Sequence, residues 1–407
     1  MAETVLTELA REVRELCASA EMNRRKRMWE TLFRGEQPER PVVKCAPFMG
    51  PWYDIVWQRL IPEDSLHFKD GPARRIEIQL RKKIVKFREL RDDDVIMPTV
   101  WVFPKPVIAS DDLWGLKIER TRTGDEGGAY KEVPPIREEA DLDRVTIPRF
   151  AKDDAADRAL IAEARELIGG LLPVKLYGNQ ISLAPYEFAV LLRGAEQLLY
   201  DVYDRPEFVH RLMARLTEGT IAYYNEREAA GSFDFEETRL LHEPWDPPPA
   251  GTENRLRSGW GYVSAQSAAS LGPEMYAEFV HPYHVPIAKL FWKIYYHGCE
   301  DLGKKVASIK DLPNLMHFHV SPWTELKDVR PHLDGRKLAI ELHAHPTNVL
   351  FVWGEKEIRA EARRRMSEAK GMAFDYVLCD LQTIDGADGK LQLWCDLAME
   401  EAHRQGS

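Results

Sequence analysis

The second half of the chain alternates short apolar runs with amphipathic segments, and this regular rhythm constrains the fold most strongly. The apolar runs at 292–297, 315–320, 337–342 and 374–379 predict strands, and the segments between them predict helices. Strands that alternate with helices at this spacing form parallel βαβ units. The sequence therefore predicts an α/β fold with a parallel sheet.

Further strands are expected in the first part of the chain. Apolar runs at 38–48, 92–102 and 173–179 predict three of them, and another strand follows a proline-rich loop at 242–262. About eight strands in alternating order favour a closed (β/α)8 barrel, the TIM barrel, over an open doubly wound sheet, which stays the alternative. No glycine-rich phosphate-binding loop follows any of these runs, which weakens a nucleotide-binding version.

The remaining segments are expected to extend one barrel domain that spans residues 1–407. Residues 3–35 carry apolar side chains at intervals of three and four, which predicts helix and gives the barrel an N-terminal helical extension over 1–35. Residues 103–150 are rich in proline, aspartate and glycine, and they predict a long excursion that carries a hairpin.

Composition and charge argue against several classes of protein. The formal net charge is −10, from 56 Lys and Arg against 66 Asp and Glu, whereas a nucleic-acid partner requires a basic face. No apolar run approaches the roughly 18 residues of a membrane span, and the N-terminus lacks the apolar region of a secretory signal. Five cysteines fit free thiols or metal ligands in a reducing compartment, so we expect a cytoplasmic protein.

The most unusual residues stand where strands are expected to end. The run 292–297 ends at His297-Gly298-Cys299, and the run 374–379 ends at Cys379. Barrel active sites lie at strand ends, so these side chains are expected to share one rim. Imidazole and two thiolates suit zinc, and three protein ligands leave one position open for catalysis. The alternative is that each cysteine simply packs in a strand.

Other polar side chains also lie at predicted strand ends. Glu341 and His343 follow the strand residues KLAI and are candidates for a fourth ligand or a general acid. His317 and His319 straddle another strand end, and His319 is placed to reach the metal, with a hydrogen-bonded structural role as the alternative. A further set at other strand ends is expected to line the pocket: Asn179, Tyr186, Tyr262 and Gln266.

Four segments, in order along the chain, carry a resemblance to a known family. They are LLRGAEQLLYDVYDRPEFVHRLM (191–213), SLGPEMYAEFVHPYHVPI (270–287), YYHGCEDL (295–302) and YVLCDLQTI (376–384). Together they resemble the uroporphyrinogen decarboxylase superfamily, and specifically its cobalamin-dependent methyltransferase branch, over roughly residues 20–400. The last two segments fall where that branch carries H-x-C and a later cysteine as zinc ligands. The resemblance therefore implies zinc at His297, Cys299 and Cys379.

The segment after the first strand departs from the decarboxylase branch of that superfamily. The branch carries arginines there for the carboxylates of its tetrapyrrole, whereas residues 44–54 read KCAPFMGPWYD and contain none. Phe48, Met49, Trp52 and Tyr53 instead predict an apolar or aromatic pocket wall, with ordinary core packing as the alternative.

The resemblance implies methyl transfer with zinc as a Lewis acid. The favoured direction moves the methyl group of a small molecule, an aryl methyl ether, to the Co(I) corrinoid of a partner protein. Trp52, Trp101, Trp245 and Trp260 are candidates for enclosing such a substrate. The alternatives are a methylcorrinoid:thiol methyltransferase, a metal-free decarboxylase and a non-catalytic barrel. The resemblance also implies a homodimer.

Overall fold

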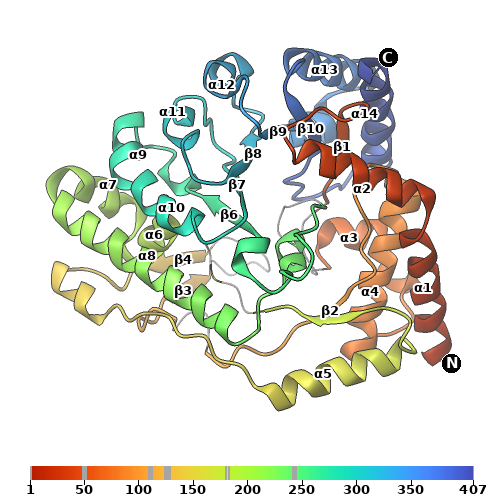
Figure 1. Ribbon diagram of the computed structural model, residues 1–407, viewed down its shortest axis with the longest axis horizontal. Coiled ribbons are helices and arrows are strands. Elements are labelled where there is room, and N and C mark those ends of the chain that lie inside the picture. The colour runs from red at the N-terminus through yellow and green to blue at the C-terminus, as the bar shows by residue number, and fades with distance from the viewer. Residues whose placement is uncertain are drawn as a thin grey trace.

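Eight parallel strands follow one another along the described chain in the order of a (β/α)8 barrel (Figure 1). The computed structural model describes residues 2–47, 53–108, 113–122, 130–178, 181, 184–240 and 245–406. The strands are β1 (Val42–Cys45), β2 (Val100–Val102), β5 (Val174–Leu176), β6 (Trp260–Ser264), β7 (Lys293–His297), β8 (Leu315–Val320), β9 (Ala339–His343) and β10 (Ala373–Leu378). Six of them form one parallel sheet in the order β1-β10-β9-β8-β7-β6, and β2 pairs with β5. The predicted α/β barrel fold is confirmed.

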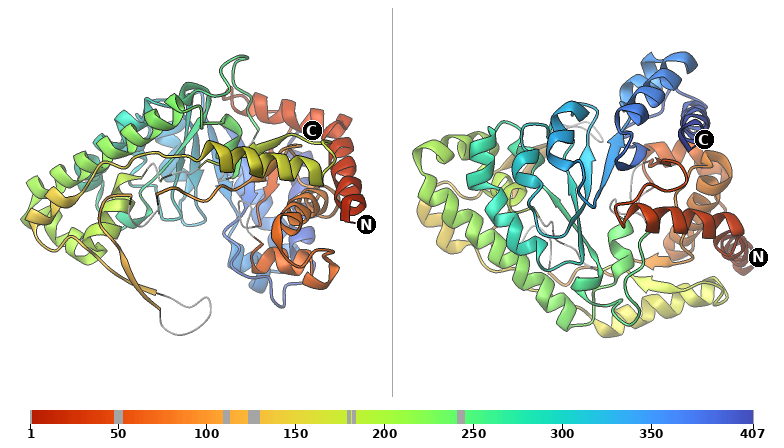
Figure 2. Two further views of the ribbon diagram at one scale, coloured as in Figure 1. Left: turned by 90° about the horizontal axis from the view of Figure 1, so that it is seen from below. Right: turned by 45° about the horizontal axis from the view of Figure 1, so that its top comes forward.

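Helices connect and cover these strands on the outside (Figures 1 and 2). They are α1 (Ala2–Cys17), α2 (Ala20–Leu32), α3 (Ile55–Leu60), α4 (Gly71–Val85), α5 (Asp154–Leu167), α6 (Pro185–Arg193), α7 (Ala195–Asp204), α8 (Pro206–Ala229), α9 (Pro273–Phe279), α10 (His281–Ala288), α11 (Val306–Ile309), α12 (Leu326–Leu333), α13 (Glu355–Glu368) and α14 (Lys390–Gly406). Within the described residues, none of these helices combines the length and the apolar character that a membrane crossing requires.

The predicted N-terminal helical extension is two helices rather than one. Helix α1 ends at Cys17, and Ser19 caps α2 by accepting a hydrogen bond from the backbone N–H of Met22 at 3.1 Å. A serine side chain at this position satisfies a backbone donor that the start of a helix leaves unpaired, so it favours a new helix over a continuous one. Helix α1 packs on α4, and Trp29 of α2 is fully buried.

The excursion between residues 103 and 150 carries the predicted hairpin. Strands β3 (Glu119–Arg122) and β4 (Tyr130–Val133) pair in antiparallel register, and the hairpin projects away from the barrel (Figure 2, left). An antiparallel pair needs only a short connection, which is why this hairpin forms without disturbing the parallel strands around it.

The strands β7 to β10 divide their side chains between two environments. Tyr296, Phe318, Leu342 and Tyr376 occupy alternate positions and are buried in the apolar layer shared with the outer helices. Because successive side chains of a strand point to opposite faces, the residues between them point into the barrel. Those inward residues are mostly polar, whereas barrel interiors are usually filled by branched apolar side chains. A polar barrel interior on this side is therefore a feature that needs a chemical explanation.

A buried ion pair fastens β1 to the segment that precedes β2. Arg40 binds both carboxylate oxygens of Asp93 at 2.7 Å, and Asp93 also accepts the backbone N–H of Val43 at 2.9 Å. The carboxylate of the neighbouring Asp92 accepts the N–H of Cys45 at 2.7 Å. Asp92 and Asp93 begin the strand predicted at 92–102, but the observed strand β2 covers only Val100–Val102. The side chains of both residues and the backbone N–H of Asp93 bond to β1 instead.

We expect Asp93→Ala to lower the free energy of unfolding by about 3–5 kcal/mol, because it leaves the buried Arg40 guanidinium unpaired. Denaturant unfolding followed by circular dichroism measures this. Asp396→Ala is the matched control, since its ion pair with Arg91 is exposed and is expected to contribute about 1 kcal/mol or less. Equal losses in the two variants would contradict the structural role of the buried pair.

Candidate metal centre

Three histidines from neighbouring strands come together near the carboxyl ends of β7, β8 and β9. Strand pairing sets His319 beside Glu341, and His343 beside Val377 of β10. The ring centre of His319 lies 4.4 Å from that of His297 and 3.9 Å from that of His343. All three imidazoles are buried, so they form one cluster inside the mouth of the barrel.

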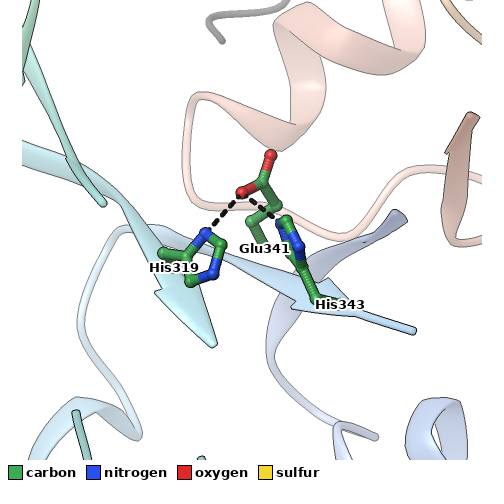
Figure 3. A group of neighbouring side chains, drawn as sticks. All are labelled: His319, Glu341 and His343. Carbon is green, nitrogen blue, oxygen red and sulfur yellow. Dashed lines mark hydrogen bonds and ion pairs between the residues drawn. The ribbon is translucent and has the colours of Figure 1, made fainter. Parts of the chain in front are cut away.

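The carboxylate of Glu341 organises this cluster. Its Oε2 atom lies 2.7 Å from Nε2 of His343 and 3.1 Å from Nδ1 of His319, and it also accepts the hydroxyl of Tyr295. Figure 3 shows the two imidazoles converging on the one oxygen from adjacent strands. Glu341 is 2% exposed, so these contacts replace the water that an ionised carboxylate would otherwise require.

The pKa directions agree with an ionised Glu341 carboxylate that accepts hydrogen bonds from a protonated Tyr295 and a neutral His319. Burial opposes ionisation of Glu341, but the interactions with His343 and His319 outweigh it and lower its pKa well below the usual value. Burial and the Glu341 carboxylate raise the pKa of Tyr295 well above its usual value, so Tyr295 keeps its proton and donates it. Burial also lowers the pKa of His319 to about 4, which leaves that imidazole neutral near pH 7.

This carboxylate fixes which nitrogen of each ring carries the proton. His343 donates through Nε2–H to Glu341, so its Nδ1 is left with a lone pair. The Tyr295 oxygen, whose proton goes to Glu341, accepts from Nδ1–H of His297 at 3.1 Å, so Nε2 of His297 is left with a lone pair. Both rings therefore present an unprotonated nitrogen on the side away from Glu341.

Each of these two lone pairs faces a cysteine sulfur. His297 Nε2 lies 3.2 Å from Cys299 Sγ, and His343 Nδ1 lies 3.1 Å from Cys379 Sγ. Cys299 is in turn 3.5 Å from the carboxylate of Asp380, the residue that follows Cys379. Burial raises the pKa of Cys299 to about 12, and it raises the pKa of Cys379 as well. The geometry brings the predicted residues His297, Cys299 and Cys379 to one end of the barrel.

The donor set fits a zinc ion. In a tetrahedral zinc site, ligand distances of about 2.0–2.1 Å to nitrogen and 2.3 Å to sulfur place a nitrogen about 3.5 Å from a neighbouring sulfur. The two nitrogen–sulfur contacts, 3.2 and 3.1 Å, are a few tenths of an ångström shorter than that separation. Compact groups of possible ligand atoms, all within 4.8 Å of one another in the described residues, are His319-Glu341-His343, His343-Cys379-Asp380 and His317-Glu341-Asp375. The predicted three-ligand set is not one of these groups, but two of the groups contain His343.

Some predicted pocket residues lie beside the cluster, and others lie outside the described residues. The half-buried ring of Tyr262 stacks on His297 at a centroid distance of 5.3 Å. Gln266 follows β6 and is exposed. Four other wall and pocket predictions, Phe48, Met49, Trp52 and Asn179, fall outside the residues that the structure describes.

Several predicted substrate contacts have other partners. The hydroxyl of Tyr53 donates to the carbonyl of Ile61, and Tyr186 is buried in the apolar layer around α6. Trp260 is the first residue of β6, at the end opposite the cluster, where its indole N–H donates to Asp246 at 3.1 Å. Trp245 donates to Glu30 of α2. These two tryptophans therefore have partners away from the cluster at the carboxyl ends of the strands.

Sequence reasoning missed Tyr295, Asp375 and Asp380. Asp375 points into the barrel and lies 2.8 Å from His317. Asp380 has a φ of 59°, a left-handed conformation that is uncommon outside glycine and that directs the chain back at the strand end. A signal was present, because polar residues occupy every second position in YYH, HFH and ELH, a pattern that marks one polar face on a buried strand.

Comparisons with known proteins agree with this fold. The chain matches no protein-family model. It is 27% identical over 134 residues to the uroporphyrinogen decarboxylase of Alkalilimnicola ehrlichii, a match that covers 30% of this chain and 33% of that protein. The solved structure of a methyltransferase from Methanosarcina mazei superposes with a TM-score of 0.56 at 12% identity, and the match covers 93% of this chain and 98% of that one. This chain spans only about a third of the length of the curated relative that it matches. The likeness to the solved methyltransferase structure shows a shared fold.

We expect the metal-free protein to hold His343 as its Nε2–H tautomer, and His319 as its Nδ1–H tautomer, because Glu341 accepts from those nitrogens. Nitrogen-15 NMR of histidine-labelled protein distinguishes the tautomers. In Glu341→Gln, the amide offers fewer acceptor positions and adds donors, so both rings are expected to become mixtures. His345, whose ring packs on Trp323, is the internal control. Unchanged tautomers in the variant would show that Glu341 does not set them.

Proposed function

We propose that this protein is a zinc-dependent methyltransferase that takes a methyl group from a methylated small molecule, an aryl methyl ether, and gives it to the Co(I) corrinoid of a partner protein. The observation that carries the proposal is the pairing of Cys299 with His297 and of Cys379 with His343 at one end of the barrel. The order and spacing of these residues, together with the methyltransferase fold of the Methanosarcina structure, support the same assignment.

The residues present fit the metal that this chemistry requires. His297, Cys299 and Cys379 would hold zinc through one imidazole nitrogen and two sulfurs, the soft and borderline donors that zinc prefers. When bound, zinc supplies Lewis acidity that polarises the ether oxygen and stabilises the leaving phenolate.

The chain's own residues orient the ligands and leave one side accessible. Tyr295 and Glu341 hold the His297 ring through its Nδ1–H, and Tyr262 stacks on its face. Cys379 is 3% exposed, whereas Cys299 is half-buried and Asp380 is exposed. The Cys299 side is therefore the side from which a substrate and a corrinoid protein would approach. Orientation of this kind is the main protein contribution when an ion supplies the charge.

A second candidate, methyl transfer from a methylcorrinoid to a thiol, uses the same ligands, because a thiolate acceptor also binds zinc. The metal-free decarboxylase is less well supported. Its substrate is multiply anionic, whereas the described groups named at this end of the barrel are carboxylates, thiols, phenols and imidazoles, without an arginine among them. Trp245 and Trp260 bond to Glu30 and Asp246 away from the cluster, so neither is expected to enclose the ether.

We expect protein purified under reducing conditions to hold about one zinc per chain, and Cys299→Ser or Cys379→Ser to lose most of it. Elemental analysis measures the metal. Cys17→Ser is the matched control, because Cys17 is buried in the N-terminal helical layer and donates to the carbonyl of Ile96. A wild-type content below about half a zinc per chain, with all thiols reduced, would contradict the proposal.

Methyl transfer is tested anaerobically with the zinc-loaded protein, a Co(I) corrinoid protein and a panel of aryl methyl ethers. Formation of methyl-Co(III), seen by its absorption spectrum, supports ether demethylation. Zinc binding without methyl-Co(III) from any ether, together with methylation of a thiol from methyl-Co(III), would favour the second candidate.

A further inference from the structure

We infer that His343 is a fourth protein ligand of the proposed metal site, through Nδ1, and that Glu341 is the positioning residue that holds it in that role. The inference rests on the proposed zinc site at His297, Cys299 and Cys379. It goes beyond that site because it adds a fourth protein ligand, His343, from the end of β9. It replaces the general-acid role as the expected function of His343.

The first argument is the orientation of the imidazole. Its Nε2 lies 2.7 Å from the Glu341 carboxylate, the shortest of the histidine contacts in the cluster for which a distance is given. A buried carboxylate requires a donor there, so the proton stays on Nε2 and Nδ1 keeps its lone pair. Metal-binding histidines commonly donate their other ring nitrogen to a carboxylate in this way.

The second argument is what the lone pair faces. Nδ1 lies 3.1 Å from Cys379 Sγ, whereas Nε2 is 3.9 Å from the same sulfur. The sulfur is therefore nearer the unprotonated nitrogen than the protonated one. This is the arrangement in which a thiol proton occupies the place between the two atoms that a metal ion would take, with the loss of that proton on binding.

The third argument is that the two halves of the site repeat one pattern. His297 and Cys299 show the same relation, with the outer nitrogen bound to Tyr295, which itself donates to Glu341, and the inner nitrogen 3.2 Å from the sulfur. One carboxylate thus orients both imidazoles, one directly and one through a phenol. The two halves meet at Asp380, which lies 3.5 Å from Cys299 and within the compact group of His343 and Cys379.

His319 is the competing fourth ligand, and the contacts favour His343. His319 also donates to Glu341, at 3.1 Å, but its other nitrogen, Nε2, has no hydrogen-bond partner in the described part of the chain, sulfur included. The proton of His319 is therefore on the nitrogen that faces Glu341, as a metal ligand requires, but among the described residues no cysteine sulfur lies beside its other nitrogen. Asp380 is exposed and bonds to the outer cysteine, so it lies over the open side of the site.

A two-imidazole, two-thiolate shell has a chemical consequence for the substrate. Two thiolates balance the charge of a divalent ion, so the resting site is neutral, and a neutral ether oxygen enters without an unpaired charge. With His343 as the fourth ligand, four protein side chains would hold the ion, and the ion would supply Lewis acidity to an ether oxygen beside it.

The test uses Co²⁺ as a spectroscopic substitute for zinc in the full chain, loaded anaerobically after removal of metal. Competition with a chelator gives the affinity, and the visible absorption bands report the ligands. We expect His343→Ala to lower Co²⁺ affinity by at least the ~10–100-fold that follows loss of an orienting residue, and to change the absorption bands. Added imidazole is expected to restore the wild-type bands by filling the vacated position.

His319→Ala is the matched variant, because it removes another buried imidazole that contacts the same Glu341 oxygen. We expect it to keep the wild-type bands. Bands that change in His319→Ala and not in His343→Ala would overturn the inference, as would bands that stay unchanged in both. Wild-type protein that binds no Co²⁺ and no zinc would overturn the inference and the proposed function together, whereas metal loss confined to the cysteine variants overturns the inference alone.

A measurement on the unmodified chain covers the case in which His343→Ala does not fold. In protein loaded with cadmium-113, proton–cadmium correlation NMR detects the ring protons of each histidine that binds the metal. We expect signals from His297 and His343. Signals from His297 alone, or from His297 and His319, contradict the assignment of His343.

Discussion

The hydrogen bonds that converge on the Glu341 carboxylate are the interaction on which the rest of the site depends. Tyr295, His319 and His343 all donate to one buried oxygen. A hydrogen bond to a charged group contributes about 1.5–3 kcal/mol, and loss of the acceptor would remove the shared partner of three buried donors. The same bonds determine which nitrogen of each imidazole is free to bind a metal. Structural stability and ligand orientation therefore come from one group.

The barrel explains why this group can be both buried and ionised. Parallel strands place Glu341 beside His319 on one side and Asp375 on the other, so inward polar residues lie in rows across the sheet. Asp375 also contacts His317, the residue two positions before His319 on β8, and Cys299 and Cys379 follow at the carboxyl ends of β7 and β10. Apolar side chains on the opposite face of the same strands supply the burial. A polar interior costs stability, and such sites are retained where function requires them.

The order of the strands was predictable because each one is a local pattern, and the parallel arrangement follows from alternation. The position of His297, Cys299 and Cys379 at one end of the barrel was predictable because strand ends meet at one rim. The contact of Cys379 with His343, rather than with His297, was not predictable from the sequence, because it depends on a ring orientation that Glu341 sets. Trp260 was a candidate for a substrate contact, but it begins its strand instead of ending it and so lies away from the cluster. The sequence shows that a residue is a tryptophan, but its position along the strand decides at which end of the barrel the side chain lies.

X-ray absorption at the zinc edge of the loaded protein tests the central claim most directly, because it measures the atoms bound to the metal. We expect a first shell of two sulfurs at about 2.3 Å and two nitrogens at about 2.0–2.1 Å, with the multiple scattering typical of imidazole. A shell of oxygen and nitrogen alone, without sulfur, would contradict the account, because it would place the metal away from Cys299 and Cys379.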